Sequence, residues 1–538
     1  MDTRSQVSPL LAFIFAIFLA VIGLSGSSYA IPAFARQYGT SCSTCHIDFP
    51  KLNDFGKAFK DAGFKFPKDD ETFIKVPPVM LGAPAQKDQW PHTIYPGTIP
   101  GLPPIGLRFN QFFQVTSKNT NNFNAQLPPG TVGSDIPRTD FEPGFFSIFT
   151  AGNFGSDIAF WVDDDISVSG ANANGSLGDG YLRFVNVSRF FKLPTDSLTV
   201  RVGQFELDLP FTQARAYDIS PYDIYVQANI GAVNPAFPQQ FVNNNFSLAD
   251  VGRGIEISGG HHYGGYRYAI AVVDQNTSGT PPTNYPNVPS ATGGSNGGVG
   301  YFSDSNFKDL YGRFAYRFNL KRDPASRHEV QAAGATGPRD HTYLTLGSYY
   351  FYGRSVQRAS GLLADDVTPT VLTAHEPFYR LGGDFDFNYR NINIFGLYMY
   401  GHDKDLVPFI PAGLMLPTGF LSGNPATFSG GFIQADFMVY PWLMTIMRWD
   451  RVNSTADYLN GIGASASSPP PLVNFLSPLS TERNRFTPGA QFLIRPNIKA
   501  SFEYQVRPKQ VVYEPGTTIP LVSPFRTNTA TLALEFAY

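Results

Sequence analysis

From Ile105 to the C-terminus, apolar and polar residues alternate with a period of two. In one of the clearest stretches, Leu310, Phe314 and Phe318 fall on one face, whereas Arg313 and Arg317 fall on the other. Successive side chains of a β-strand point to opposite faces, so this period predicts strands with one apolar and one charged face. An apolar face toward lipid and a charged face toward water are typical of a transmembrane barrel.

Sixteen segments with this pattern follow one another along the chain. They lie near residues 105–116, 144–152, 157–168, 180–191, 197–207, 251–259, 265–274, 307–320, 341–353, 377–389, 391–402, 428–440, 442–452, 484–495, 497–507 and 524–538.

Long and short connections alternate between these segments. The long ones are 117–143, 208–250, 275–306, 354–376, 403–427, 453–483 and 508–523, and only 321–340 is longer than a turn where a turn is expected. Bacterial outer-membrane barrels combine short periplasmic turns with longer outer loops. The alternative, a soluble β-sandwich, needs neither this alternation nor so many strands long enough to cross a membrane. The pattern therefore predicts an all-β fold, a transmembrane antiparallel β-barrel of about 16 strands.

The last segment sets the orientation of the barrel. Leu532, Leu534, Phe536 and Tyr538 alternate with smaller or polar residues, and the strand ends on an aromatic residue. Such an ending resembles the assembly signal of outer-membrane proteins. A periplasmic C-terminus and an even number of strands put Ile105 at the same end, so we expect both termini in the periplasm.

The region before the barrel divides into three parts. Residues 1–30 read as a signal peptide, with Arg4, a 15-residue apolar run and a small-residue cleavage site. That run is too short for the alternative, a membrane-spanning anchor helix. We expect a small α-helical domain at residues 31–76 and a connector at 77–104, whose eight prolines disfavour regular structure. The barrel then occupies residues 105–538.

Composition supports a membrane protein. Charged residues make up only 15% of the chain, below the roughly 25% of soluble domains, while Phe (48) and Tyr (27) are abundant. After the N-terminal run no apolar stretch is long enough for a membrane-spanning helix. The formal charge of −3 argues against a nucleic-acid partner.

The candidate chemistry lies in the N-terminal domain, in the sequence Cys42-Ser43-Thr44-Cys45-His46. Two thiols at this spacing, followed by a histidine, form the attachment motif of c-type haem, in which the histidine is the proximal iron ligand. The chain has only two cysteines, so one covalently attached haem c is expected. The alternatives are a redox thiol pair or half of a zinc site, and no further zinc ligands at ordered spacing are visible.

A short amphipathic helix follows the motif. Leu52, Phe55, Phe59 and Ala62 recur at helical spacing, Pro50 suits a first turn, and Gly63 suits the end of the helix. The apolar stripe is expected to cover the haem or to form an ordinary small core.

Residues 31–66, IPAFARQYGTSCSTCHIDFPKLNDFGKAFKDAGFKF, resemble the N-terminal domain of the fused monohaem cytochrome–porins, outer-membrane proteins of iron-oxidising bacteria. The resemblance is specific over these residues and only architectural beyond them. It implies an electron-transfer protein, an extracellular iron(II) oxidase, that takes electrons from extracellular ferrous iron or another redox partner. A periplasmic electron-carrier cytochrome would accept them, and lipid of the outer membrane would surround the barrel.

Two other functions remain open. The first is a solute-diffusion porin in which the haem domain is a plug or gate. The second is a protein that delivers electrons outward to external acceptors. The distal haem ligand is also open. Met80 and His92, both in the connector, are the candidates, and a water-bound iron is the alternative.

Further charged groups are weaker candidates. The lumen face should carry Arg108, Arg313, Arg317, Lys499 and Glu503, either as a generic lining or as partners of haem propionates, for which Arg36 is a nearer candidate. Asp163–Asp165 and His261–His262 read as solvated residues rather than metal sites. The loop 208–250, with Tyr217, Asp218, Tyr222, Asp223 and Tyr225, is long enough to fold inward and narrow the pore or meet the haem.

Overall fold

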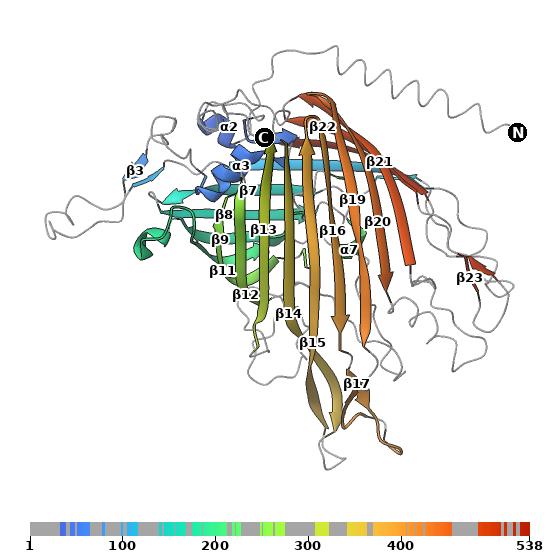
Figure 1. The fold of residues 1–538 in the computed structure, drawn as a ribbon. Helices are drawn as coiled ribbons and strands as arrows, with labels where there is room; N and C mark the ends of the chain where they lie inside the picture. Colours follow the sequence, from blue (N-terminus) through green and yellow to red (C-terminus); the bar gives the residue numbers. More distant parts are fainter. Residues whose placement is uncertain are drawn as a thin grey trace, which may run out of the picture.

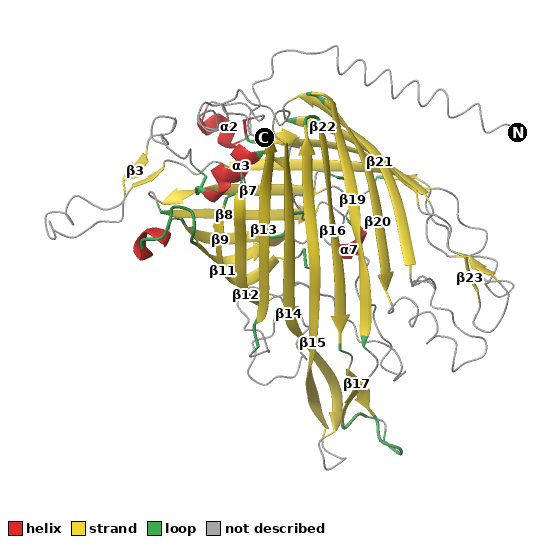
Figure 2. Cartoon of the chain, in the orientation of Figure 1, coloured by secondary structure: helices red, strands yellow, loops and turns green. Residues whose placement is uncertain are grey.

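The computed structural model is a closed antiparallel β-barrel of sixteen long strands (Figures 1 and 2). It describes residues 33–38, 44–48, 51–64, 78–80, 98–100, 105–116, 139–141, 145–154, 157–167, 175–185, 187–211, 218–220, 222–226, 248–249, 251–261, 264–274, 307–321, 342–362, 369–404, 406–414, 416–422, 425–454, 482–495, 497–506, 511–513, 520–522 and 528–537.

Each long strand pairs with its neighbours along the chain, and the last pairs with the first. The strands are β5 (Ile105–Thr116), β7 (Phe145–Phe154), β8 (Ile158–Ser167), β9 (Gly175–Phe184), β10 (Thr199–Glu206), β11 (Val251–Gly260), β12 (Gly265–Asp274), β13 (Asp309–Lys321), β14 (Thr342–Leu362), β15 (Pro369–Tyr389), β16 (Ile392–Asp403), β19 (Ala426–Tyr440), β20 (Leu443–Ser454), β21 (Glu482–Arg495), β22 (Ile498–Val506) and β25 (Asn528–Ala537). The two-residue β6 (Thr139–Asp140) pairs with β5. Thr529 opposite Thr116 and Ala537 opposite Arg108 close the barrel.

The remaining elements are short. Three two-stranded hairpins lie outside the barrel sheet: β3 (Pro78–Met80) with β4 (Thr98–Pro100), β17 (Leu406–Phe409) with β18 (Gly419–Ser422), and β23 (Val511–Tyr513) with β24 (Pro520–Val522). A fourth, β1 (His46–Asp48) with β2 (Lys51–Leu52), lies in the N-terminal region beside the helices α2 (Ala33–Tyr38) and α3 (Asp54–Asp61). The 3₁₀ helix η3 (Val187–Phe191) follows β9, and α7 (Asp223–Val226) follows β10. Among the described residues, no helix is long and apolar enough to cross a bilayer.

The two faces of the strands follow the predicted alternation. On β13, Phe314 is 53% exposed on the outer face, whereas Arg317 is 5% exposed on the inner face. An apolar outer surface and a polar inner surface fit lipid outside and a polar lumen inside, as in outer-membrane barrels. The short turns, the end of β25 and the start of β5 share one end, which is the periplasmic end of such a barrel.

Two sequence-based boundaries in the barrel were wrong. The segment predicted at 180–191 is displaced: β9 ends at Phe184, and residues 187–191 form η3. β9 begins at Gly175, before the predicted segment, and at Gly178 the Asp163 carboxylate lies where a side chain would project. The predicted loop 354–376 is mostly strand, because β14 and β15 stay paired from Arg354–Pro377 to Leu362–Pro369. This long hairpin extends past its neighbours at the outer end of the barrel (Figure 1).

The helix after the haem motif also starts later than predicted. α3 begins at Asp54 rather than near Pro50, because Asn53 caps it and Lys51–Leu52 pair with β1. Gly63 does end the helix, with φ +83°, a conformation that glycine adopts without strain. Residues 1–30, most of the connector, Cys42 and His92 lie outside the described residues.

Candidate functional site

The second half of the haem motif lies at a hairpin fixed to the start of α3. His46 lies opposite Leu52 in the β1–β2 pair. The backbone N–H of Asn53 donates to the Cys45 carbonyl (2.9 Å), and its side-chain amide donates to the Thr44 carbonyl (3.0 Å). The Asn53 side-chain oxygen also accepts from the Gly56 N–H (2.8 Å), which caps the helix. One residue therefore orients both the motif and the helix.

The donors in this hairpin suit covalent haem attachment. Cys45 and His46 are half-buried, so the thiol and the imidazole are not enclosed by the fold. A thiol and an imidazole on adjacent residues are the chemistry that this attachment uses. Cys42 and His92 lie outside the described residues, as does the side chain of Met80, whose backbone belongs to β3. The same holds for the side chain of Arg36 on α2.

An aromatic cluster connects the two N-terminal helices to the barrel wall. The ring of Phe59 meets those of Phe34 and Tyr38 edge-on, with centroids 5.3 and 5.5 Å apart. Phe64 stacks on Trp161 of β8 (5.4 Å), and the Tyr38 hydroxyl donates to the Phe64 carbonyl (2.9 Å). The apolar stripe of α3 thus forms a small core shared with the inner wall of the barrel.

The described parts of residues 44–64, here called the docked segment, are held to that wall by polar contacts with five strands, four of which supply charged partners. Lys51 donates to Asn393 on β16 (2.7 Å) and to Asp436 on β19 (3.1 Å). Asp54 accepts two hydrogen bonds from Arg317 on β13, each 2.8 Å. Asp61 pairs with two further arginines, Arg183 on β9 (3.1 Å) and Arg267 on β12 (3.0 Å).

These partners place the docked segment inside the lumen. Arg183, Arg267, Arg317 and Asp436 all lie on the inner faces of their strands and near the periplasmic ends. Figure 1 shows α2 and α3 at the end of the barrel where the C-terminus lies. The hairpin that carries Cys45 and His46 therefore sits in the periplasmic mouth.

A second segment enters the lumen from the outer end. The described parts of 207–226, here called the inward loop, start at the wall of β12 and β13. There Asp208 accepts from Arg267 (3.1 and 3.0 Å), and Tyr311 donates to its carbonyl (3.0 Å). Phe211 then stacks on Phe395 of β16, with ring centroids 4.6 Å apart.

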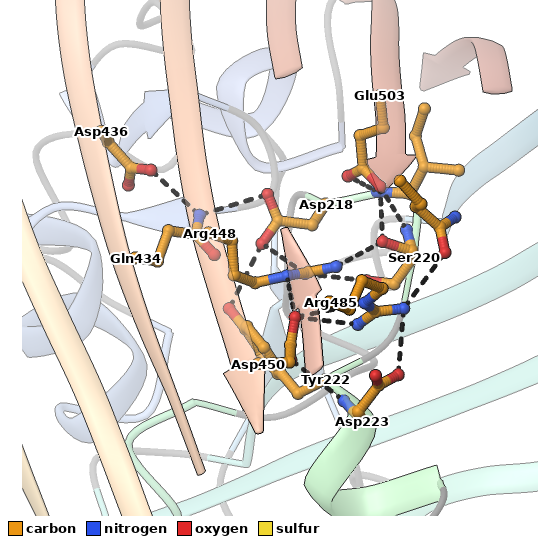
Figure 3. A network of polar contacts seen from close by, with 12 residues as sticks. Asp218, Ser220, Tyr222, Asp223, Gln434, Asp436, Arg448, Asp450, Arg485 and Glu503 are labelled. Atoms are coloured by element: carbon orange, nitrogen blue, oxygen red, sulfur yellow. Dashed lines mark hydrogen bonds and ion pairs between the residues drawn. The ribbon is translucent and has the colours of Figure 1, made fainter. Parts of the chain in front are cut away.

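The far end of the inward loop is fixed to β19–β22 by a buried polar network (Figure 3). The Glu503 carboxylate accepts from the backbone N–H groups of Ile219 (2.6 Å) and Ser220 (3.0 Å). Arg448 lies 3.4 Å from the Asp218 carboxylate, and Arg485 lies 3.0 Å from that of Asp223. The inward loop therefore crosses the lumen from one wall to the other, as the length of the connection allowed.

Burial governs the chemistry of this network. It raises the pKa of the Asp218 carboxyl to about 6, while the Arg448 guanidinium opposes that rise. Asp450, on β20 of the barrel wall, forms ion pairs with Arg448 (3.0 Å) and Arg485 (3.1 Å). Fixed, mutually satisfied charges of this kind hold one arrangement of a loop.

The four cations predicted on the lumen face are each paired with a carboxylate. Arg108 and Lys499 pair with Glu535 (2.9 and 3.8 Å). Arg313 pairs with Asp384 (2.7 Å), and Arg317 with Asp54. The lumen position of these side chains was predicted correctly from the sequence, but their partners were not. Those partners lie on nearby strands or in the docked segment, and strand periodicity carries no information about them.

Two wall residues link the docked segment to the inward loop, Arg267 directly and Gln434 through Asp436. Arg267 binds Asp61 of the first and Asp208 of the second. Gln434 donates to Asp218 (3.2 Å) and to Asp436 (2.9 Å), which in turn binds Lys51. These bridging positions were missed in the sequence. The only signal was a polar residue on the inner face of its strand, which many other positions share.

The weaker candidates do not form a metal site in the described part of the chain. Among these residues, no group of three or more His, Cys, Asp or Glu side chains is arranged to hold a metal ion. Asp163 accepts from the Asp179 backbone N–H, and His261 lies 4.0 Å from Asp196. His262 lies outside the described residues.

Sixteen strands, an apolar outside, a polar lumen and an inward loop define the fold class. The chain folds as a porin-like barrel of the bacterial outer membrane. No family model matches the chain, and no curated protein matches it in sequence.

Several solved barrels resemble it in structure. The outer membrane channel DcaP of Acinetobacter baumannii aligns with 11% identity and a TM-score of 0.41, over 81% of this chain and 97% of that one. Salmonella typhi OmpF, in complex with daunomycin, aligns with 9% identity and a TM-score of 0.43, over 83% of this chain and 99% of that one. An anion-selective porin from Comamonas acidovorans aligns with 10% identity and a TM-score of 0.43, over 81% of this chain and 98% of that one. These similarities concern the fold of the barrel and give no information about what passes through it.

Proposed function

We propose that the protein carries electrons across the outer membrane by means of a haem bound to Cys42, Cys45 and His46. The observation that carries the proposal is the position of the docked segment, whose charge pairs hold the Cys45–His46 hairpin in the periplasmic mouth of the lumen. A single bound haem supplies one-electron transfer between an outer donor and a periplasmic carrier.

The geometry matters because lipid is an insulating gap. The hydrocarbon core of a bilayer is roughly 30 Å thick, so a redox centre free in the periplasm has no access to an outer donor. Docking in the lumen shortens that gap, and the mouth still faces a periplasmic electron-carrier cytochrome. The donor that fits this proposal is dissolved ferrous iron entering from the outer loops. Met80 or His92 in the connector would supply the sixth iron ligand.

The test uses proteoliposomes of known orientation that contain the oxidised holoprotein. Ferrous iron added on the loop side should reduce the haem in a single-electron step, followed by its absorbance. Replacement of both Cys42 and Cys45 by serine should abolish acid-stable haem and the response. Reduction only from the periplasmic side would exclude conduction across the membrane.

A solute channel with a closing plug is the second candidate, and a specific observation favours it. Arg267 binds both the docked segment and the inward loop, and Gln434 links Asp218 of the inward loop to Asp436, which binds Lys51. Displacement of one segment therefore weakens the attachment of the other. Such coupling suits a gate. In the same liposomes, uptake of small solutes without electron transfer would support the channel and reject the conduit.

A further inference from the structure

One periplasmic connection presents large apolar side chains that nothing in the barrel covers. Between β9 and β10, η3 and the residues after it expose Phe190 (75%), Phe191 (66%) and Leu193 (50%). Three adjacent apolar side chains held in water are uncommon for a folded surface and indicate an interaction site.

The connection is a fixed structure that holds these rings outward. The Ser188 N–H donates to the Leu198 carbonyl (3.3 Å), and the Leu193 N–H donates to the Ser188 carbonyl (3.0 Å). The Arg189 guanidinium binds the Asp157 carboxylate (2.8 Å), which fixes the connection to the turn between β7 and β8. The rings therefore project from a braced support.

The neighbouring apolar surface indicates what covers them. At the periplasmic ends of β7 and β9, Phe154 and Phe184 are 44% and 36% exposed on the lipid-facing side. η3 begins three residues after Phe184, so its rings continue the apolar belt of the barrel. Arg189 and Lys192 flank the rings with positive charge, and the guanidinium lies 5.4 Å from the Phe190 ring centre. Aromatic rings beside basic groups match the boundary between acyl chains and phosphates.

We propose that residues 187–193 are an interfacial anchor in the periplasmic leaflet. Phe190, Phe191 and Leu193 enter the acyl region, Lys192 faces the lipid phosphates, and Arg189 braces the connection through Asp157. The anchor fixes the rim of the barrel beside β9, whose Arg183 binds Asp61 of the docked segment. This inference rests on the fold and is independent of the haem.

The test is fluorescence quenching of full-length protein in phospholipid vesicles. Phe190→Trp and Phe191→Trp are each compared with wild type, so that the emission of the four native tryptophans is subtracted. Thr195→Trp, at an exposed position of the same connection beside Asp196, is the matched control. Gel migration of unheated protein checks that each variant forms the barrel.

Lipids brominated on the acyl chain should quench the added emission of Phe190→Trp and Phe191→Trp several-fold more than that of Thr195→Trp. Acrylamide in water should show the opposite order. Acrylamide quenching of both ring positions equal to that of Thr195→Trp would overturn the proposal. Emission insensitive to both quenchers would also overturn it, because a protein rather than lipid would then cover the surface.

Discussion

The position of Gly56 decides whether the haem motif and α3 can pack together. A side chain at this position would overlap the Cys45 carbonyl oxygen and crowd the Leu52 side chain. The first of these groups is backbone and already accepts a hydrogen bond from Asn53, so it cannot move aside cheaply. The tight approach fixes the Cys45–His46 hairpin relative to the helix.

Gly56→Ala should therefore destabilise the docked segment by about 1–3 kcal/mol, the usual cost of overpacking. Amide hydrogen exchange over 54–61 should rise, and the yield of acid-stable haem should fall. Gly312→Ala on β13 is the control, because no atom lies within 4 Å of the added methyl group. Equal exchange in the two variants would show that the close approach is unimportant.

Asn53 offers a finer test, because its side chain makes two separable hydrogen bonds. Asn53→Asp keeps the acceptor for the Gly56 N–H but loses the donor to the Thr44 carbonyl, whereas Asn53→Ala loses both. The alanine variant should lose about 1 kcal/mol more helix stability than the aspartate variant. Hydrogen exchange of the first turn of α3 measures the difference. If the variants behave alike, the cap is not what holds the helix.

At the scale of elements, the docked segment and the inward loop should loosen together when Arg267 is changed. Arg267→Gln removes charge pairs to Asp61 and Asp208, and breaking a largely buried pair costs about 3 kcal/mol. Hydrogen exchange should rise both in α3 and in the described part of the inward loop.

Arg183→Gln is the matched control, because Arg183 binds Asp61 and the Lys60 carbonyl, both of which belong to the docked segment. Its effect should stay within α3. A rise in the inward loop of similar size would mean that the two segments communicate by another route.

The strands show how much of the fold the alternation of apolar and polar residues can predict. Each of the sixteen predicted strands has a counterpart in the barrel, because lipid outside and a polar lumen inside impose the same alternation on all of them. Boundaries failed where tertiary contacts overrode local signals. β9 starts at Gly175 because it pairs there with Ile166 of β8, and at Asn53 the cap delays the helix. The Cys42–His46 motif can be read because its residues are close together in sequence, whereas Arg267 and Gln434 act between segments far apart in sequence.

At the scale of the whole molecule, two segments lie in the lumen, and we expect both to restrict it. The docked segment lies in the periplasmic mouth, and the inward loop crosses deeper, from Asp208 at β12 to Asp223 at β21. Each segment has its own wall contacts in addition to the shared ones. Release of the docked segment should therefore open the lumen only in part, because Glu503, Arg448 and Arg485 still hold the inward loop.

Single-channel conductance in planar bilayers measures this directly. The triple variant Lys51→Gln, Asp54→Asn and Asp61→Asn removes the charges that dock the segment, so its conductance should exceed that of the wild type several-fold. A further change, Glu503→Gln, weakens the hold on Ile219 and Ser220 and should raise conductance again. Lys308→Gln, which breaks the exposed pair with Asp274, is the control and should leave conductance at the wild-type value. A wild type that already conducts as well as the triple variant would mean that the docked segment does not obstruct the lumen, and the bridging contacts at Arg267 and Gln434 would then serve only to stabilise the barrel.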